Sequence, residues 1–358
     1  MNRLRTLLLA GVSASLLAAG TQSSLADSTR YEQKNLVSDG TIPAAHVDTH
    51  LVNAWGIAFN PAGFVWVNAA DGGVSVLYDG AGNPAPVGNP LVVQIPSANN
   101  VYDPLGNPTG IVFSGSNNEF LVAPGAPARF IFASEQGIIS AWAPTVDATH
   151  AIFKRQTPGA VYKGLALADD HLFAANFSQR RIDVFDNTFA PVKLPRWAFR
   201  DERVPHGYGP FNVQAIGDRL FVSYALVNRK TNDEIDGPGL GFVDEFSVHG
   251  RLIARVAAHG ALNAPWGLAL APAAWGQPAG TLLVGNFGNG RINLFRPRHD
   301  GGYAFAGQVR DTHGKTLVID GLWALLQGTA TTGGTNVLWF SAGPDDEAHG
   351  LLGQLQMP

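Results

Sequence analysis

Three polar side chains, Lys163, Asn212 and Gln214, interrupt a short apolar segment that recurs along the chain. Most other copies of the segment carry aromatic residues, glycine or aliphatic residues at these positions. If the segment is buried, each polar group needs a hydrogen-bonding or charged partner. The partner is either an internal polar network or a bound ligand, and both interpretations stay open.

A second polar pattern precedes three of the later apolar runs. Asn68, Asn176 and Asn286 each lie six residues before the first apolar residue of a short apolar run. These first apolar residues are Val74, Ile182 and Ile292. Asparagine tolerates the left-handed conformation and hydrogen-bonds its own backbone, so turn formation is the simpler explanation. The alternative is a ring of amides that binds a polar or sugar-like ligand.

Acidic residues are concentrated in two stretches. They are Asp233, Glu234 and Asp236 in a long insertion, and Asp345, Asp346 and Glu347 near the C-terminus. Such oxygen-rich groups can hold Ca²⁺, so a divalent cation such as calcium is the one cofactor the sequence suggests. Neither stretch has the spacing of an EF-hand loop. We therefore interpret both as solvated loops.

Several catalytic motifs are missing from the sequence. It has no Gly-x-Ser-x-Gly, no His-Glu-x-x-His, no phosphate-binding P-loop and no Gly-x-Gly-x-x-Gly after an apolar strand. With Cys 0, thiol catalysis and cysteine-ligated zinc are excluded. Whether the protein is an enzyme stays open.

The recurring segment defines the architecture that must position these residues. Six copies, at intervals of 48 to 57 residues, begin at Trp55, Thr109, Lys163, Phe211, Trp266 and Trp323. Short runs of alternating apolar residues, separated by glycine- and proline-rich turns, follow most copies. A period near 50 with short strands predicts an all-β, six-bladed β-propeller with four antiparallel strands in each blade.

The two ends of the chain are expected to complete one blade. The sixth unit ends at Pro358 without a fourth strand, whereas the run at residues 31–37 precedes the first unit and belongs to none. We predict that this run forms the outer strand of the last blade. Closure of this kind removes an exposed strand edge.

The N-terminus has the pattern of a secretory signal peptide. Arg3 and Arg5 precede an apolar stretch at residues 7–19, and the small-x-small triplet at residues 24–26 fits a cleavage site. The stretch is shorter than the roughly 20 residues that span a bilayer. We expect residues 1–26 to be removed, leaving residues 27–358 as one propeller domain in the periplasm or outside the cell, with no membrane insertion.

The composition limits the partners. Lys+Arg 24 against Asp+Glu 28 gives a mildly acidic chain, which argues against nucleic acid as a partner. An exported protein without cysteine has no disulfide framework, so burial must stabilise it. We expect a monomer that meets a small polar ligand or an extracellular or periplasmic protein.

Residues 284–292 resemble the NHL repeat of β-propellers, in which Val-Ala-Asp is followed by two residues, Asn, one residue and Arg. Arg181 and Arg291 fall on the arginine of that motif, and Asn289 falls on its asparagine. The acidic position is taken by asparagine in three units, at Asn68, Asn176 and Asn286. The resemblance therefore implies an NHL-like blade in which an amide-to-arginine hydrogen bond replaces the usual ion pair.

The whole chain after residue 26 is similar to a functionally uncharacterised family of secreted bacterial six-bladed propellers. The matching segments are residues 51–58, 162–166, 211–214, 286–293 and 342–347. This resemblance implies the fold and export, but no activity.

Two functions of different classes remain. The first is a scaffold that binds a ligand or partner at the mouth of the central channel. The second is a metal-dependent, lactonase-like hydrolase, in which Asn176, Asn212, Asn286 and Glu135 would surround one divalent ion on the axis. We favour binding because carboxylates near the axis are scarce in the sequence.

Overall fold

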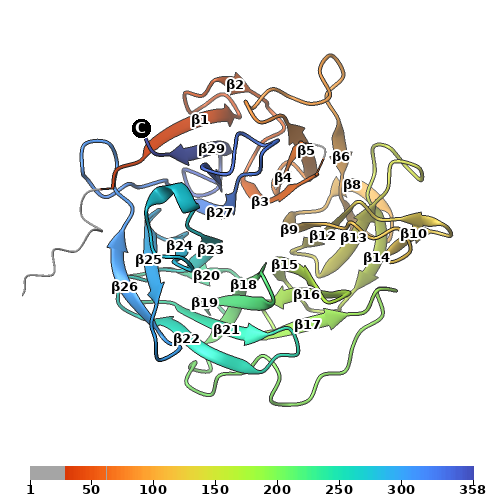
Figure 1. Ribbon diagram of the computed structural model, residues 1–358. Helices are drawn as coiled ribbons and strands as arrows, with labels where there is room; N and C mark the ends of the chain where they lie inside the picture. The colour runs from red at the N-terminus through yellow and green to blue at the C-terminus, as the bar shows by residue number, and fades with distance from the viewer. Residues whose placement is uncertain (1–28, 62) are drawn as a thin grey trace, which may run out of the picture.

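The six recurring segments form the innermost strands of six antiparallel sheets, which are arranged as blades around one axis (Figure 1). The computed structural model describes residues 29–61 and 63–358. The predicted six-bladed β-propeller is confirmed. The predicted signal peptide lies outside the described residues. Within them, no helix is long and apolar enough to cross a membrane.

Five of the six blades contain four strands. Blade 1 contains β3 (Ala54–Phe59), β4 (Val65–Ala69), β5 (Val74–Tyr78) and β6 (Val92–Gln94). Blade 2 contains β9 (Pro108–Phe113), β12 (Phe130–Ser134), β13 (Ile138–Trp142) and β14 (Ile152–Gln156). Blade 4 contains β18 (Tyr208–Ile216), β19 (Arg219–Val227), β21 (Phe242–Ser247) and β22 (Leu252–Ala258). Blade 5 contains β23 (Pro265–Leu270), β24 (Leu282–Asn286), β25 (Ile292–Pro297) and β26 (Tyr303–Gln308).

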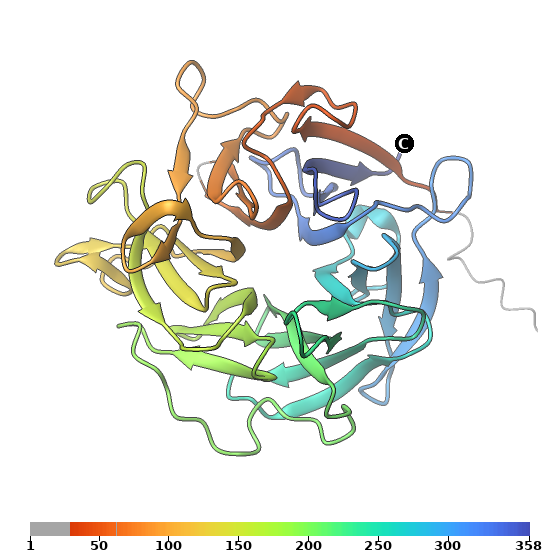
Figure 2. The same ribbon diagram turned by 180° about the vertical axis from the view of Figure 1, so that it is seen from behind.

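Blade 6 closes the ring with strands from both ends of the chain. It contains β27 (Leu322–Gln327), β28 (Leu338–Ala342), β29 (Leu351–Gln356) and β1 (Glu32–Ser38). The antiparallel pairing of β1 with β29 confirms the predicted outer strand. Figure 2 shows the two ends side by side from the opposite face. A short strand, β2 (His46–Val47), pairs in parallel with β1.

Blade 3 differs from the four-stranded prediction. It contains only β15 (Tyr162–Ala168), β16 (His171–Asn176) and β17 (Arg181–Phe185). After β17 the chain forms one bridge, between Phe185 and Pro191, and then continues as an irregular linker. The linker bonds to β17 through the Val192 N–H and is then held at blade 4, where the Phe199 N–H donates to the Gly250 carbonyl, so it does not continue along β17.

Three short hairpin elements lie outside the blade pattern. β7 (Pro96–Ala98) pairs with β8 (Val101–Leu105) after blade 1, and β10 (Leu121–Ala123) pairs with β11 (Ala126–Pro127) inside blade 2. β20 (Glu234–Ile235) belongs to the insertion between β19 and β21 and pairs with the end of β19. This last element extends blade 4 beyond the disk.

The innermost strands approach one another closely at the axis. A Cβ atom at Gly110 would collide with the backbone of Leu165 in the next blade, and one at Gly164 would collide with Asn212. Only glycine permits this spacing. The glycines at the second position of the recurring segment therefore have a packing role.

Irregular pairing turns the first residue of the segment toward the axis. The register between the first and second strands skips Lys163 in blade 3, Phe211 in blade 4 and Trp266 in blade 5. Similar register shifts lie at Trp55 and Trp323. A bulge of this kind redirects a side chain that regular alternation would place on a blade face.

The aromatic residues redirected in this way fill the axis. We call Trp55, Phe211, Trp266 and Trp323 the aromatic plug; they come from blades 1, 4, 5 and 6. Trp55 stacks on Trp323 at 3.7 Å between ring centroids, and Trp266 lies edge-on to both at 6.5 and 5.9 Å. All four side chains are buried. The plug therefore packs against itself across the axis and leaves no aromatic ring to stack on a ligand inside the channel.

Candidate binding site at the axial mouth

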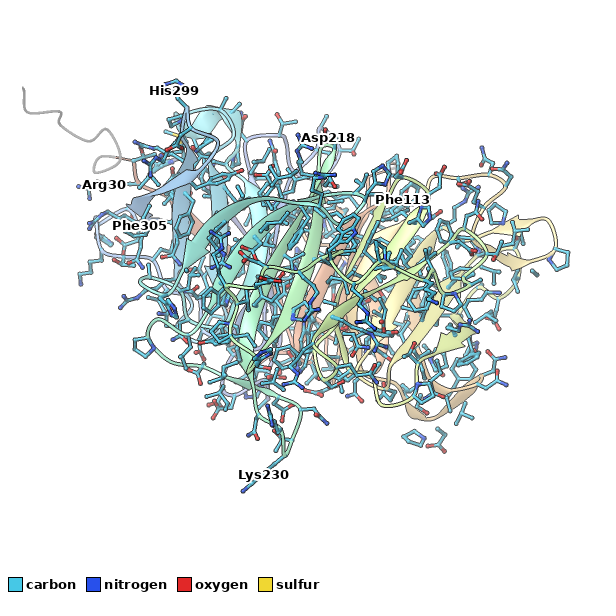
Figure 3. The ribbon with its side chains drawn as sticks, turned by 90° about the horizontal axis from the view of Figure 1, so that it is seen from below. Arg30, Phe113, Asp218, Lys230, His299 and Phe305 are labelled. Atoms are coloured by element: carbon cyan, nitrogen blue, oxygen red, sulfur yellow. The ribbon has the colours of Figure 1, made fainter. Side chains whose placement is uncertain are left out.

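The axial mouth is the face of the disk where the innermost strands begin and where the turns after the second strand of each blade lie. The blade-4 insertion projects from the disk, and Figure 3 shows Lys230 at its tip, on the side opposite Asp218 and His299. Residues from five blades meet here above the aromatic plug. We call Asn53, Asp71, Glu135, Lys163, Glu234 and Glu347 the axial cluster.

Lys163 lies at the centre of the axial cluster. Its side chain is 3% exposed, and its Nζ lies 2.6 Å from Glu135 Oε1, 3.6 Å from Glu234 Oε2 and 3.9 Å from Asp233 Oδ1. The same Nζ lies 5.0 Å from the centroid of the Trp55 ring. The ammonium is thus held between carboxylates and an aromatic face, both of which stabilise a positive charge.

Asn53 connects two further carboxylates to the plug. Its Nδ2 donates to Glu347 Oε2 at 2.6 Å and to Asp71 Oδ2 at 3.2 Å. Its Oδ1 accepts a hydrogen bond from Trp323 Nε1 at 2.9 Å. Asn53 is buried and has a φ of 50°, a conformation that asparagine tolerates better than most residues. This geometry fixes the positions of both carboxylates.

Two turns with unusual backbones deliver the more distant acids. The pairing of Val227 with Glu234 folds the insertion back so that Glu234 reaches Lys163. Residues 345–347 have φ values of 58°, 51° and 69°, three consecutive non-glycine residues in the left-handed region. Each such residue costs on the order of 1 kcal/mol or more. The strained turn places the Glu347 carboxylate on Asn53.

Three carboxylates of the axial cluster, those of Asp71, Glu234 and Glu347, are harder to ionise than usual. Burial, and then the negative charge of Glu234, raise the pKa of Glu347 to about 7, although Lys163 opposes the change. Burial raises the pKa of Glu234 above its ordinary value, with Lys163 opposing and Glu135 adding to the effect. Burial also raises the pKa of Asp71. One lysine therefore does not balance the acids around it.

The same interactions keep Lys163 charged and raise its pKa. Burial alone would lower its pKa, but the charges of Glu135 and Glu234 outweigh burial and hold the pKa above its ordinary value. The ammonium form is therefore the stable form at neutral pH. It is a fixed positive charge rather than a proton donor or acceptor.

One acceptor in the axial cluster lacks a donor. Glu234 is 6% exposed, and its Oε2 receives no hydrogen bond from any described residue, with Lys163 Nζ at an ion-pair distance of 3.6 Å. Buried carboxylate oxygens normally accept hydrogen bonds. The charge on Glu234 Oε2 is thus balanced by the ion pair with Lys163 and not by a hydrogen bond.

The structure brings together two of the residues predicted from sequence, Lys163 and Glu135. Asn212 lies nearby, but its Nδ2 donates to the Trp266 carbonyl at 2.9 Å and its Oδ1 accepts from the Val213 N–H. Gln214 is half-buried further along β18. No described hydrogen bond or ion pair joins Gln214 to the axial cluster.

The three asparagines of the turn pattern are fully buried and bonded to protein neighbours. Asn68 donates to the Thr109 carbonyl at 3.0 Å, Asn176 to Asp183 Oδ2 at 2.6 Å and Asn286 to the Ala261 carbonyl at 2.8 Å. Asn176 Oδ1 also accepts from the N–H of Gln179, as in a local turn. The structure does not gather them at the axial mouth.

Sequence reasoning missed Asn53, Asp71, Glu234 and Glu347 as site residues. The interpretation of both acidic stretches as solvated is wrong for Glu234, which is buried, and for Glu347, which is bonded to Asn53. It holds for Asp345 and Asp346, which are exposed. Comparison of the same turn among blades was the available signal, because Asp71 and Glu135 both lie within two residues of the end of a second strand.

The axial cluster is not arranged as a metal centre. Among the described residues, no group of three or more His, Asp or Glu side chains has a geometry that could hold a metal ion. The point where the carboxylates approach one another is taken by the Lys163 ammonium. The cluster is suited to hydrogen-bonding and charge interactions.

No protein-family model matches the chain. In solved structures, it is similar to a streptogramin B lyase (14% identity, TM-score 0.51, 92% of this chain and 97% of that chain). It is also similar to a protein of unknown function from Bacteroides thetaiotaomicron (11% identity, TM-score 0.52, 86% and 70%). At these identities the likeness shows the propeller fold alone.

Sequence comparison gives a closer relationship. The chain is 34% identical over 333 residues to the uncharacterised protein L690 of Acanthamoeba polyphaga mimivirus, covering 89% of this chain and 84% of that protein. The matched relative is viral, whereas the sequence resemblance pointed to a bacterial family. The chain therefore belongs to the uncharacterised propeller family that includes mimivirus protein L690.

Proposed function

We propose that the protein is a binding scaffold whose axial mouth takes a positively charged ligand, either a small organic cation or a cationic group of a partner. The observation that supports this proposal is the gathering of carboxylates from four blades around Lys163 and Asn53. Glu135 and Glu234 pair with the Lys163 ammonium, whereas Asp71 and Glu347 accept hydrogen bonds from Asn53. A second positive charge at the mouth would offset the excess negative charge.

The electrostatics of the axial cluster favour such a ligand. Mutual repulsion contributes to the raised pKa of Glu347 and of Glu234, so ionisation of these groups opposes stability near neutral pH. An ammonium or guanidinium group placed beside them lowers that repulsion.

The plug determines how such a ligand approaches. Because Trp55 and Trp323 fill the axis below Lys163, a ligand rests on the outer side of the cluster instead of threading the channel. Glu135 and Asp233 remain 31% and 62% exposed on that side. These two carboxylates are accessible from solvent.

The alternative of a metal-dependent, lactonase-like hydrolase has less support. Two of its proposed ligands already use the Oδ1 atom that would bind a metal, because Asn176 Oδ1 accepts from the Gln179 N–H and Asn212 Oδ1 accepts from the Val213 N–H. A divalent ion beside Glu135 would also lie close to the Lys163 ammonium and be repelled by it. Binding without catalysis therefore agrees better with the geometry of the described residues.

The N-terminal pattern supports export as part of this proposal. A positive segment, an apolar stretch and a cleavage triplet within residues 1–26 are typical of secreted proteins. The ligand would then be met in the periplasm or outside the cell. N-terminal sequencing of the protein recovered from cell fractions tests this point, and a retained Met1 in the cytosolic fraction would contradict it.

A thermal-shift series tests the ligand class. The full-length protein is heated with agmatine, spermidine, glucose, Ca²⁺, Mg²⁺, Mn²⁺ or Zn²⁺, and with EDTA. A ligand that binds only the native state raises Tm by mass action. We expect the two organic cations to raise Tm, glucose to have no effect and EDTA to leave Tm unchanged.

Two variants locate the effect. Glu347→Gln removes a charge from the axial cluster but keeps the acceptor for Asn53, whereas Asp346→Asn removes a charge from the same turn at an exposed position. We expect the Tm increase to shrink in Glu347→Gln and to persist in Asp346→Asn. Strong destabilisation by EDTA that one divalent ion reverses would instead support the hydrolase.

A further inference from the structure

Blade 3 leaves the outer edge of its last strand uncovered. A cavity of about 610 Å³ lies along β17, between this strand and residues 191–200 of the linker that follows it. In Figure 1 the linker runs along the rim of the disk beyond β17. The volume lies within the range of ligand-binding cavities, roughly 300–1,000 Å³.

The backbone of β17 is open to this cavity at Ile182. The Val192 N–H donates to the Val184 carbonyl at 2.8 Å, and the linker then departs from the strand. Backbone groups alternate in direction along a strand, so the N–H and C=O of Ile182 point outward as those of Val184 do. In blade 5 the equivalent carbonyl, of Ile292, accepts a hydrogen bond from the Val309 N–H at 2.9 Å. Ile182 has no such outer partner in the described chain.

The linker is anchored on its far side, which keeps the cavity from closing. The Phe199 N–H donates to the Gly250 carbonyl at 2.8 Å, and the Phe199 ring packs against Phe173 and Phe246, each at 5.6 Å between centroids. Phe199 thus wedges the linker between blades 3 and 4. Collapse of the linker onto β17 would break this packing.

The cavity has the opposite charge to the chain as a whole. Its lining contains one acid, Asp183, and five basic residues: Arg180, Arg181, Lys193, Arg196 and Arg200. Arg181 pairs with Asp183, and Arg180 donates to the His206 carbonyl. Among described residues, Lys193, Arg196 and Arg200 have no ion-pair or hydrogen-bond partner. This is a local excess of positive charge in a chain with a formal net charge of −4.

We propose that blade 3 binds an extended acidic peptide as its missing fourth strand. The peptide backbone hydrogen-bonds to Ile182, and its carboxylates pair with Lys193, Arg196 and Arg200. Strand addition to an exposed sheet edge is a general mode of peptide recognition. An open backbone edge and unpaired cations in one cavity favour an acidic polypeptide over a small anion, which needs no strand edge. The site differs from the axial mouth in position and in the charge of its ligand.

Fluorescence anisotropy with labelled hexapeptides tests this proposal on the full-length protein. The probes are an alternating Glu-Val peptide, its Lys-Val counterpart and a Glu-Val peptide with N-methyl groups at alternate residues. We expect only the unmodified Glu-Val peptide to bind well, with affinity at least fivefold above that of the N-methylated form. N-methylation keeps the charge but removes backbone N–H donors.

A matched pair of triple variants locates the peptide. Lys193→Gln/Arg196→Gln/Arg200→Gln removes the unpaired cations of the cavity, and Lys34→Gln/Arg298→Gln/Lys315→Gln removes three surface cations from blades 5 and 6. We expect about a tenfold loss of affinity in the first and little change in the second. Glu347→Gln should leave peptide binding unchanged.

Three results would overturn the proposal. Equal binding of the N-methylated peptide would show attraction by charge without strand addition. Equal losses in the two triple variants would place the peptide elsewhere. Full competition by tripolyphosphate at the same concentration as unlabelled peptide would indicate a small-anion site instead.

Discussion

At the scale of single residues, Lys163 determines how the axial mouth is held together. Its ammonium is buried, with Glu135 and Glu234 as ion-pair partners, and its aliphatic chain lies between blades. Removal of one partner from a buried ion pair leaves the other charge uncompensated, which costs more than the pair itself contributes. The stability of the mouth therefore depends on the balance between this lysine and its acids.

Lys163→Met tests this balance. The variant keeps the length of the side chain but leaves Glu234 buried without a counter-charge. We expect the free energy of unfolding, measured in urea at pH 7.5, to fall by about 3–5 kcal/mol. The double variant Lys163→Met/Glu234→Gln should recover part of the loss, because the unpaired buried charge is removed as well. No recovery would mean that packing, and not charge, explains the effect.

Glu347 should make the stability of the protein depend on pH. Its pKa is about 7 in the folded protein against an ordinary value of 4.5. Between these values the native state binds more protons than the unfolded state, so this group makes unfolding easier as pH rises. We expect stability to fall less between pH 5 and pH 8 in Glu347→Gln than in the unmodified protein.

Urea unfolding at the two pH values measures this difference, and Asp346→Asn is the control. Asp346 is exposed in the same turn, so its variant should keep the dependence of the unmodified protein. Identical pH dependence in all three proteins would show that Glu347 ionises normally.

The sequence indicates some of these residues and hides others. Lys163 stands out because five other units carry a different residue at its position. Glu234 and Glu347 do not, because their places depend on an insertion that folds back along β19 and on a left-handed turn. Both are tertiary features that override the usual preference of acidic loops for solvent.

At the scale of elements, a buried ion-pair network fastens the linker to blade 4. Arg255 on β22 contacts Asp244 on β21, and its Nη2 lies 2.5 Å from Asp201 Oδ2 in the linker. Asp244 and Asp201 have side chains that are 0% and 3% exposed. Burial raises the pKa of Asp244 to about 7 even though Arg255 opposes the change. Arg255 is thus the cation that the two buried acids share, while Asp201 also accepts hydrogen bonds from Arg203.

Arg255→Met should break the ion pairs that hold the linker to blade 4. Because it leaves two buried carboxylates without their shared cation, we expect the free energy of unfolding to fall by about 3–5 kcal/mol. Arg203→Gln is the matched control, since Arg203 also contacts Asp201 but is 64% exposed. The control should cost about 1 kcal/mol or less. Equal losses in the two variants, measured by urea unfolding, would show that burial of Arg255 adds nothing.

Most strands follow from alternation and turn residues, as in blade 5, where the apolar runs at 281–285 and 291–295 correspond to β24 and β25. The fourth strand of blade 3 does not form, although repetition predicts it. The linker bonds to β17 through the Val192 N–H, and Phe199 then draws it toward blade 4. Repetition thus predicts the plan of a blade, whereas local sequence decides whether each strand forms.

At the scale of the whole molecule, the ring is closed by hydrogen bonds between distant parts of the chain. β1 pairs with β29 over six residue pairs, with one irregularity between Asn35 and Val37. The Tyr31 ring also packs against Trp275, tilted by 42° with 4.1 Å between ring centroids, which ties the residue before β1 to blade 5. Without β1, the edge of β29 would be exposed.

A chain that begins at Asp39 should therefore be far less stable than one that begins at Thr29. We expect the shorter chain to unfold at a lower urea concentration and to aggregate, because an exposed edge strand pairs with other chains. Urea unfolding and light scattering measure the two effects. Equal stability of the two chains would show that the ring does not depend on this strand.

The overall architecture could be predicted from the sequence because each blade uses the same apolar segment followed by short alternating strands. The six segments and the strand at residues 31–37 are sufficient to predict the ring and its closure. The axial bulges were not accessible, because a skipped residue such as Trp266 looks like any other member of an apolar strand. These bulges are what move the tryptophans from the blade faces to the axis.

The aromatic plug gives the molecule a built-in optical signal. Two indole rings stacked at 3.7 Å couple their electronic transitions, so Trp55 and Trp323 should dominate the near-ultraviolet circular dichroism. The Lys163 ammonium lies 5.0 Å from the Trp55 ring, where its charge shifts the emission of that indole. Displacement of the ammonium at the mouth should therefore shift the wavelength of tryptophan fluorescence emission, which can be measured without a label.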